Sequence, residues 1–229
     1  SSYVGAIGDD QNGSFMKEKM LAKEIDISHL YVKKGDTAVT NIDIVDGERI
    51  FQSYNPGVLD NFKLKKKDIN FINKHDLIHS SLAGKVINSF HLFKKKGLIT
   101  SFDFSDEIFY NNNINSNNTL NILSYIDYAF FSYPHAKKRA ENDIKEIYYS
   151  YQNSGIIVFT LGSRGSLAFN GNKLFWQKSA AKNIIDTLGA GDSFIAGFMD
   201  QVVKGKNIQA CLNYGTELAL KTIQHNGAW

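Results

Sequence analysis

A glycine-rich turn followed by a segment of helical periodicity constrains the fold of this chain more than any other feature. The turn at residues 185–194 reads Ile-Asp-Thr-Leu-Gly-Ala-Gly-Asp-Ser-Phe and follows a short strand-like stretch at residues 183–185. Because the first amide groups of a helix lack intrahelical acceptors and attract anions, we expect Gly189, Ala190 and Gly191 to form an anion hole. The apolar residues that follow recur at helical spacing and predict one buried face: they are Phe194, Ile195, Phe198, Met199, Val202 and Val203.

Asp192 is the unexpected residue of this turn, because a carboxylate repels an anion bound beside it. One explanation is that Asp192 accepts the proton of a nucleophile that attacks a bound phosphate. A second is that it only caps the helix, a common role for aspartate. A dinucleotide site is a third, but it needs a second strand and an acidic residue about 20 positions further on. Residues 204–207, Lys-Gly-Lys-Asn, lead into another helical segment instead.

The composition indicates one large domain and excludes several classes of partner. The chain has 229 residues, of which 43% are hydrophobic, so it can bury a sizeable core. Its net charge of +3 is too small to indicate a nucleic-acid partner. No apolar run reaches the roughly 18 residues of a membrane span, and the single cysteine, Cys211, lies on the apolar face of a helical segment at residues 208–224. We therefore expect a cytoplasmic protein with neither a membrane nor a nucleic-acid partner.

Strand-like and helix-like segments alternate along most of the chain, which predicts an α/β fold with a mainly parallel central sheet between helices. We expect helices at residues 11–23, 85–96, 134–151, 194–203 and 208–224, and strands at 2–7, 30–33, 76–79, 98–104, 127–132, 156–159, 165–169 and 174–177. Ligands of such sheets bind beyond the carboxyl ends of the strands. The loops predicted there are residues 80–84, 103–106, 160–165 and 189–192.

Residues 37–54 predict a β-hairpin around Asp46-Gly47, a strong turn signal. A two-residue turn places Val45 opposite Glu48, and therefore Ile42 opposite Phe51. We interpret this hairpin as a small β lid on an α/β domain formed by residues 1–36 and 55–229. Its apolar face could be covered by a second copy of the chain, giving a homodimer through the lid. Its other face is either solvent-exposed or presents polar groups to a hydroxyl-rich substrate, and the candidates are Asn41, Asp43, Gln52 and Tyr54.

The complete string Asp-Thr-Leu-Gly-Ala-Gly-Asp-Ser-Phe resembles the signature of the ribokinase/PfkB sugar kinases. Other landmarks of that family follow in order along the chain: Gly8-Asp9-Asp10 with Gly13, Thr37, and Thr160-Leu161-Gly162 with Gly165. The resemblance implies a three-layer ribokinase-like fold, ATP with Mg²⁺ as cofactor, and a sugar hydroxyl as phosphate acceptor. It implies that Asp192 is the catalytic base and that Gly189, Ala190 and Gly191 form the anion hole. Thr160, Gly162 and Gly165 would contact the nucleotide phosphates, and Thr216 and Asn226 would lie on the adenine side.

Two further stretches resemble one branch of this family, the fructoselysine 6-kinases. They are residues 102–106, Phe-Asp-Phe-Ser-Asp, and residues 221–229 at the end of the sequence. The branch implies a ketosamine acceptor phosphorylated at its 6-hydroxyl. If the acceptor is fructoselysine, a group must meet its cationic nitrogen; Asp43 on the polar hairpin face is a candidate, and the alternative is a solvated strand residue. Asp103 is a further substrate candidate. Another sugar kinase of the family, fructokinase-like or ribokinase-like, remains an alternative, as does a nucleotide- or sugar-binding module without catalysis.

The sequence departs from the family pattern at two places. Many members carry an Asn-x-x-Glu motif tied to magnesium where this chain has Ser132-Tyr133-Pro134-His135. The sequence therefore assigns no metal ligand. Family members also begin with an earlier strand bearing substrate ligands, so we expect a further segment to precede residue 1.

Overall fold

The computed structural model describes residues 1–45, 48–94, 97–106, 109, 118–151, 155–180 and 184–227. The chain divides into two compact units. The first comprises Ser1–Lys74 and Leu82–Ser89, and the second comprises His75–Ser81 and Phe90–Trp229. This division falls elsewhere than at the predicted boundaries of the hairpin, residues 37 and 54. The function of the hairpin as a lid stays a prediction.

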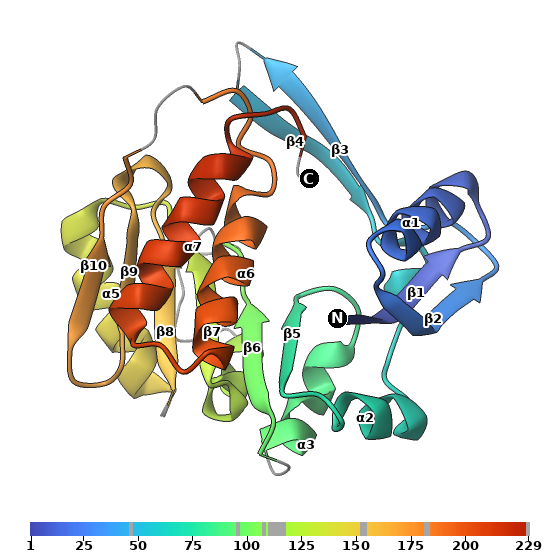
Figure 1. Cartoon of the computed structure of the whole chain (residues 1–229), viewed down its shortest axis with the longest axis horizontal. Helices are drawn as coiled ribbons and strands as arrows, with labels where there is room; N and C mark the ends of the chain where they lie inside the picture. The colour runs from blue at the N-terminus through green and yellow to red at the C-terminus, as the bar shows by residue number, and fades with distance from the viewer. Residues whose placement is uncertain are drawn as a thin grey trace. The chain divides into compact units, whose positions relative to one another are not determined.

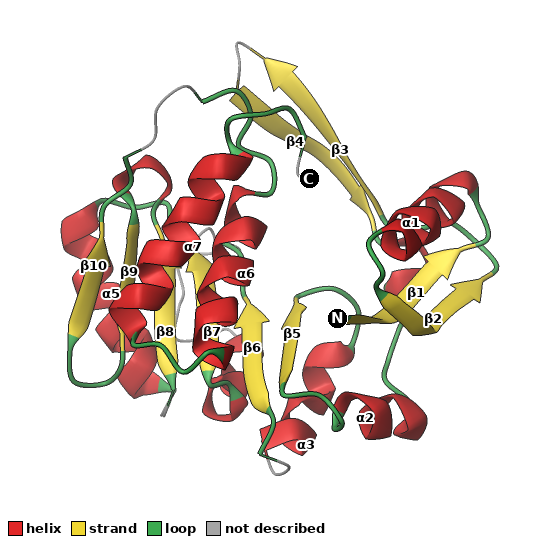
Figure 2. Ribbon diagram, in the orientation of Figure 1, coloured by secondary structure: helices red, strands yellow, loops and turns green. Residues whose placement is uncertain are grey.

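The second unit contains a mixed, mainly parallel sheet of six strands in the order β10-β9-β8-β7-β6-β5 (Figure 2). The four strands from β5 to β8 pair in parallel, whereas β9 is antiparallel to β8 and to β10. The predicted sheet is therefore confirmed. Its strands are β5 (Leu77–Ser81), β6 (Ile99–Asp103), β7 (Tyr128–Ser132), β8 (Ile156–Thr160), β9 (Ser166–Phe169) and β10 (Leu174–Gln177).

Helices cover both faces of this sheet, with α6 (Ala190–Val203) and α7 (Ile208–Thr222) on one face and α5 (Lys137–Ser150) on the other (Figure 1). The predicted apolar stripe of α6 packs on the sheet except for Val203, the last residue of the helix, which is 53% exposed. Cys211 of α7 is buried in the same core, as expected. The buried members of this core are Phe130, Val158, Ala168, Phe194, Ile195, Phe198, Met199, Cys211 and Leu212. Shorter elements are α3 (Phe90–Lys94) and 3₁₀ helices at Asn118–Tyr125 and Gly162–Arg164.

Several predicted element boundaries were wrong. The strand expected at residues 30–33 begins at Asp26. The helix expected at residues 85–96 begins as a 3₁₀ helix, Val86–Ser89, because the Asn88 amide donates to the Lys85 carbonyl three residues earlier. α5 begins after Ala136 rather than at residue 134, since the carbonyls of residues 133–135 accept bonds from a side chain instead of helix amides. Ile185 is not in a strand; its amide donates to the Ile223 carbonyl at the end of α7. The preceding residues 181–183 lie outside the described residues.

The first unit holds two small sheets. β1 (Ser2–Gly8) and β2 (Asp26–Lys33) form a parallel pair connected by α1 (Gln11–Ala22). β3 (Val39–Val45) and β4 (Glu48–Asn55) form the predicted antiparallel hairpin. A 3₁₀ helix, Gly57–Leu59, and α2 (Lys66–Ile72) follow. Asp68 of α2 is completely buried and accepts hydrogen bonds from Tyr31 Oη at 2.6 Å and the Lys65 amide at 2.8 Å, with His29 Nδ1 also at 2.6 Å.

The register of the hairpin confirms that Ile42 lies opposite Phe51. A bulge between Asn41 and Ile42 then shifts the pairing by one residue, so Asn41 lies opposite Ser53 and Tyr54 lies opposite Thr40. Directly opposed residues share a face. The predicted placement of Tyr54 on the face of Asn41 is therefore wrong, because an uninterrupted register cannot reveal a bulge. The predicted Asp46-Gly47 turn lies outside the described residues.

The family landmarks of the first unit meet in one hydrogen-bond network. Asp10 caps α1, accepting from the Gly13 amide at 2.8 Å, and also accepts from the Thr37 amide at 2.9 Å and the Thr37 hydroxyl at 2.5 Å. The Thr37 hydroxyl in turn accepts from the Gly8 amide at 2.9 Å. These bonds, first among them the one from the Thr37 hydroxyl, hold the pKa of Asp10 below its usual value. The landmarks of this unit thus join β1 to the start of α1.

Candidate active site

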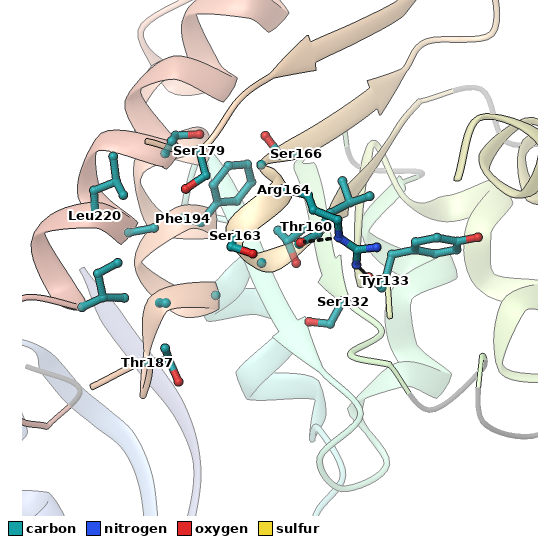
Figure 3. Close-up of a pocket in the computed structure, with 18 of the residues that line it drawn as sticks. Ser132, Tyr133, Thr160, Ser163, Arg164, Ser166, Ser179, Thr187, Phe194 and Leu220 are labelled. Carbon is teal, nitrogen blue, oxygen red and sulfur yellow. Dashed lines mark hydrogen bonds between the residues drawn. The ribbon is translucent and has the colours of Figure 1, made fainter. Parts of the chain in front are cut away.

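A cavity of about 530 Å³ opens at the carboxyl ends of β7 and β8 and at the amino end of α6 (Figure 3). This volume lies within the range typical of small-molecule sites. The cavity therefore lies at the edge of the sheet where the sequence predicted ligand binding, beyond the carboxyl ends of the strands. Its wall is formed by residues 132–134 after β7, residues 160–166 from β8 to β9, residues 190, 191 and 194 of α6, and residues 216, 219, 220 and 223 in and just after α7, with Asp106, Ser179, Ile184 and Thr187 completing it.

The strand register explains why polar residues line the sheet side of the cavity. Val158 lies opposite Ala168, and both pack against α6 and α7. Side chains two residues apart share a face, so Thr160 and its partner Ser166 face the same helices. Beyond the last apolar pair, Val158 and Ala168, these hydroxyl groups take the positions that apolar core side chains hold earlier on the strands. The Ser166 side chain is 1% exposed, and its Oγ has no hydrogen-bond partner among the described residues.

Most residues predicted to bind the nucleotide or the anion line this cavity: Thr160, Gly162, Gly165, Ala190, Gly191 and Thr216. Asn226 does not; it is exposed on the turn after α7 and is absent from the cavity wall. The nucleotide-binding roles of all these residues stay predictions. The sequence interpretation missed Ser132, Ser166 and Ser179, although a polar residue at the end of each buried strand was a usable signal for the first.

The amino end of α6 has the geometry expected of an anion site. Gly189 is the N-cap residue, with φ at +74°, a left-handed conformation that glycine adopts without strain. Within the described residues, the amides of Gly191 and Asp192 have no backbone acceptor. Asp192 itself makes no capping bond, and its carboxylate is exposed. The interpretation of Asp192 as a mere helix cap therefore loses its support.

Hydrogen bonds tie this glycine-rich turn to the end of α7. Asp186 accepts from the Leu188 amide at 2.9 Å and from the Gly227 amide at 3.0 Å. The Thr222 hydroxyl of α7 donates to the Ser193 hydroxyl in the first turn of α6 at 2.7 Å. The first Asp of the motif thus has a structural part that the sequence did not reveal. The turn is therefore held both by a bond among its own residues and by bonds to Thr222 of α7 and to Gly227 beyond it.

Arg164 organises the opposite wall instead of pointing into the cavity. Figure 3 shows its guanidinium lying toward Tyr133. It donates to the carbonyls of Leu161 at 3.1 Å, Tyr133 at 3.3 Å and Pro134 at 3.4 Å, and also to that of His135. The loop after β7 and the loop after β8 are therefore fastened together by one side chain. Arg164 lies in the loop predicted to contact the phosphates, but its guanidinium binds backbone carbonyls instead.

Asp103, a predicted substrate residue, ends β6 and is half-buried. Burial raises the pKa of its carboxyl to about 6, the Ser105 amide opposes this shift, and the charges of Asp192 and Asp106 add to it. The charge of Asp192 thus contributes to the raised pKa of Asp103, although Asp103 does not line the 530 Å³ cavity. The other substrate candidates, Asn41, Asp43, Gln52 and Tyr54, are exposed on the hairpin of the first unit, and their role stays a prediction.

The described part of the chain contains no group of three or more His, Cys, Asp or Glu side chains placed to hold a metal ion. Nor does it contain a helix long and apolar enough to cross a membrane.

The family model described as pfkB family carbohydrate kinase matches residues 1–229. The chain belongs to this family. It is similar to the fructoselysine 6-kinase of Escherichia coli K12, with 34% identity over 97% of this chain and 82% of that protein. It is also similar to the fructosamine kinase FrlD of Bacillus subtilis, with 29% identity over 100% of this chain and 79% of that protein. The protein is therefore a sugar kinase of the pfkB family.

Solved structures show the same fold. The ribokinase of Arabidopsis thaliana complexed with ribose and ATP matches 99% of this chain and 77% of its own, with a TM-score of 0.80 and 20% identity. A fructokinase from Vibrio cholerae O395 in its fructose, ADP and calcium ion bound form matches 100% of this chain and 80% of its own, with a TM-score of 0.79 and 20% identity. The pfkB kinase has the predicted three-layer ribokinase-like fold.

Proposed function

We propose that this pfkB kinase transfers phosphate from ATP to a ketosamine such as fructoselysine, at its 6-hydroxyl. One observation carries the phosphoryl-transfer step. The carboxylate of Asp192 is free of capping bonds and sits in the first turn of α6, beside amide groups that have no acceptor and beside a cavity of ligand size.

The chemistry follows from that arrangement. Asp192 accepts the proton of the acceptor hydroxyl as its oxygen attacks the terminal phosphorus of ATP. The amide groups at Gly189, Ala190 and Gly191 stabilise the charge on the transferred phosphoryl group. Thr160, Gly162, Gly165 and Thr216 support the nucleotide in the cavity, and Asn226 lies on the adenine side. The bond between the terminal phosphorus and its bridging oxygen breaks, which releases ADP.

ATP fits the groups that are present. The cavity combines a helix amino end, which favours phosphate, with apolar side chains of α6 and α7 such as Phe194 and Leu220. Mg²⁺ would neutralise the nucleotide phosphates, and proteins commonly hold it through one or two carboxylates together with those phosphates. No residue of this chain is assigned to it.

The choice of a ketosamine rests on the relatives whose names specify fructoselysine and fructosamine. Such acceptors carry a cationic nitrogen as well as sugar hydroxyls. Asp43 is the proposed partner of that cation, and Asn41, Gln52, Tyr54 and Asp103 are proposed substrate residues. A fructokinase-like or ribokinase-like acceptor is the alternative that an acceptor panel would reveal.

The experiment measures ATP consumption by the protein with fructoselysine, fructose, ribose and adenosine as acceptors, and then compares Asp192→Asn. Removing a general base costs about 10²–10⁴ in turnover, while ATP binding, measured by calorimetry, should persist. The matched control is Asp200→Asn on the same helix, where Asp200 pairs with Lys204 at 2.7 Å. Near-normal turnover by Asp192→Asn would refute the assignment of the base. A wild-type protein that binds ATP but phosphorylates no acceptor would instead indicate a binding module.

A further inference from the structure

The face of the six-stranded sheet toward α6 and α7 differs in polarity between β7 and β8 on one side and β5 and β6 on the other. On β7 and β8 this face is apolar in the rows that pair Tyr128 with Ile156 and Phe130 with Val158, and it becomes polar only at Ser132 and Thr160. On β5 and β6 it begins apolar, with Leu77 and Ile99 packed against the core of these helices. It then turns polar for two consecutive rows, in which His79 lies opposite Ser101 and Ser81 lies opposite Asp103. Four adjacent polar side chains thus occupy positions that the sheet pattern would otherwise give to apolar residues; we call them the polar quartet, His79, Ser81, Ser101 and Asp103.

His79 is the member of the quartet whose ring is both held and accessible. Its Nδ1 lies 2.9 Å from the hydroxyl of Ser101, which is 0% exposed. The ring itself is exposed. Within the described residues, Nε2 has no hydrogen-bond partner. In either tautomer the bond to Ser101 fixes the plane of the imidazole and leaves one nitrogen free to contact a ligand.

Two members of the quartet lie within electrostatic range of the proposed catalytic base. The Asp192 carboxylate acts electrostatically on both His79 and Asp103. Protein atoms crowd around His79 although its surface remains accessible, and this partial desolvation lowers the pKa of His79 to about 4, with Asp192 opposing the shift. Because an ordinary histidine is also largely neutral above pH 7, the ring can be treated as a neutral hydrogen-bonding group under assay conditions. A neutral imidazole beside a carboxylate suits hydroxyl groups rather than a second anion.

We propose that His79 is an acceptor-binding residue, and that its Nε2 forms a hydrogen bond with a sugar hydroxyl other than the one that is phosphorylated. This inference rests on the proposed function, because it assumes that the acceptor hydroxyl is presented to Asp192. Ser101 is then a positioning residue that holds the ring. The contact selects polyhydroxylated acceptors and orients them, whereas ATP is bound by the separate cavity at β8 and α6.

The test compares His79→Ala, His79→Asn and Ser101→Ala with the wild-type protein, using whichever acceptor of the panel it phosphorylates best. One hydrogen bond between neutral groups is worth roughly a 3- to 10-fold change in affinity. We expect KM for the acceptor to rise by about that factor in His79→Ala, with KM for ATP and the melting temperature unchanged. His79→Asn, which keeps a donor and an acceptor, should recover part of the loss. The matched control is His91→Ala, since His91 is exposed on α3 and its ring lies edge-on to Tyr125.

Acceptors that each lack one hydroxyl identify the partner. The roughly 3- to 10-fold penalty of His79→Ala should vanish for the analogue missing the contacted hydroxyl and persist for the others. An unchanged acceptor KM in His79→Ala, or an equal penalty with every analogue, would overturn the inference. So would an equal rise in the KM of ATP together with a lowered melting temperature, because that pattern indicates a structural role. If the wild-type protein phosphorylates no acceptor, the proposed function fails first, an outcome distinct from an active protein that ignores the substitution.

Discussion

Gly165 offers the sharpest test of how the nucleotide cavity is built. Its φ is +103°, and a Cβ added there would lie 2.0 Å from the Gln177 carbonyl oxygen and 2.8 Å from the Ser179 amide nitrogen. Real Cβ atoms essentially never approach other atoms closer than 3.0 Å, and both of these atoms are backbone. In Gly165→Ala, either the loop or the end of β10 must therefore move by about 1 Å, apart from a backbone strain of roughly 1–3 kcal/mol.

The displacement should reach the nucleotide of the proposed function, because two hydrogen bonds tie Gly165 into the loop of residues 160–165, which is proposed to contact the phosphates. Its carbonyl accepts from the Leu161 amide at 2.8 Å, and its amide donates to the Gly162 carbonyl at 3.0 Å. A misplacement of about 1 Å can cost roughly 100-fold in rate. The strain should lower the melting temperature by about 2–12 °C, at about 2–4 °C per kcal/mol for a chain of this size.

The assay is acceptor-dependent ATP consumption, measured well below the melting temperature of each variant, with the melting temperature recorded by circular dichroism. Gly205→Ala is the matched control, because Gly205 has a φ of +69° on the turn after α6 but no atom lies within 4 Å of its added Cβ. This variant should lose stability through strain and keep its turnover. If Gly165→Ala also kept its turnover, the close approach of β10 to this loop would not govern the position of the nucleotide.

Three further outcomes are expected. Arg164→Ala should raise KM for ATP by about 3- to 10-fold, the change in affinity expected if the loosened loops lose positioning worth about one hydrogen bond, roughly 1 kcal/mol. Arg164→Lys should not rescue it, because a single ammonium group cannot replace the fork that joins both loops; steady-state kinetics will show whether it does. Burial would raise the pKa of Asp68, but its bonds from Tyr31, His29 and the Lys65 amide together lower it. The stability that the Asp68 carboxylate contributes is therefore present above its unfolded-state pKa, near 3.8, and is lost as the pH falls through its lower folded-state pKa. The melting temperature of Asp68→Asn should therefore fall below that of the wild type at pH 7 and approach it below about pH 3; equal differences at both pH values would contradict this. The pKa of Asp103 is raised to about 6, so its carboxylate opposes folding above that pH. Asp103→Asn should therefore stabilise the free protein at pH 8 by at most about 3 kcal/mol and by little at pH 4. A loss of stability at pH 8 would count against the burial of this group.

Local patterns in the sequence were sufficient to predict the elements that carry the site. The apolar stripe of α6 and that of α7 follow from helical spacing, and both are buried as expected apart from Val203 at the end of α6. The alternation of strands and helices predicted the parallel sheet and the edge at which its loops converge, where Thr160 and Gly191 now line one cavity. These features can be predicted from the sequence because the side-chain period of a helix or strand depends only on neighbouring residues.

The tertiary structure alone decided which polar groups meet. Ser101 lies opposite His79 across 22 residues of chain, and Arg164 reaches carbonyls about 30 residues earlier. The bulge that moves Tyr54 to the face of Thr40 depends on pairing between two strands, not on either strand alone. Asp192 could equally have capped its helix, until the fold supplied Gly189 as the cap and left the carboxylate free. Register, loop anchoring and capping all result from competition among distant partners, and a periodic pattern in one segment carries no information about which partner wins.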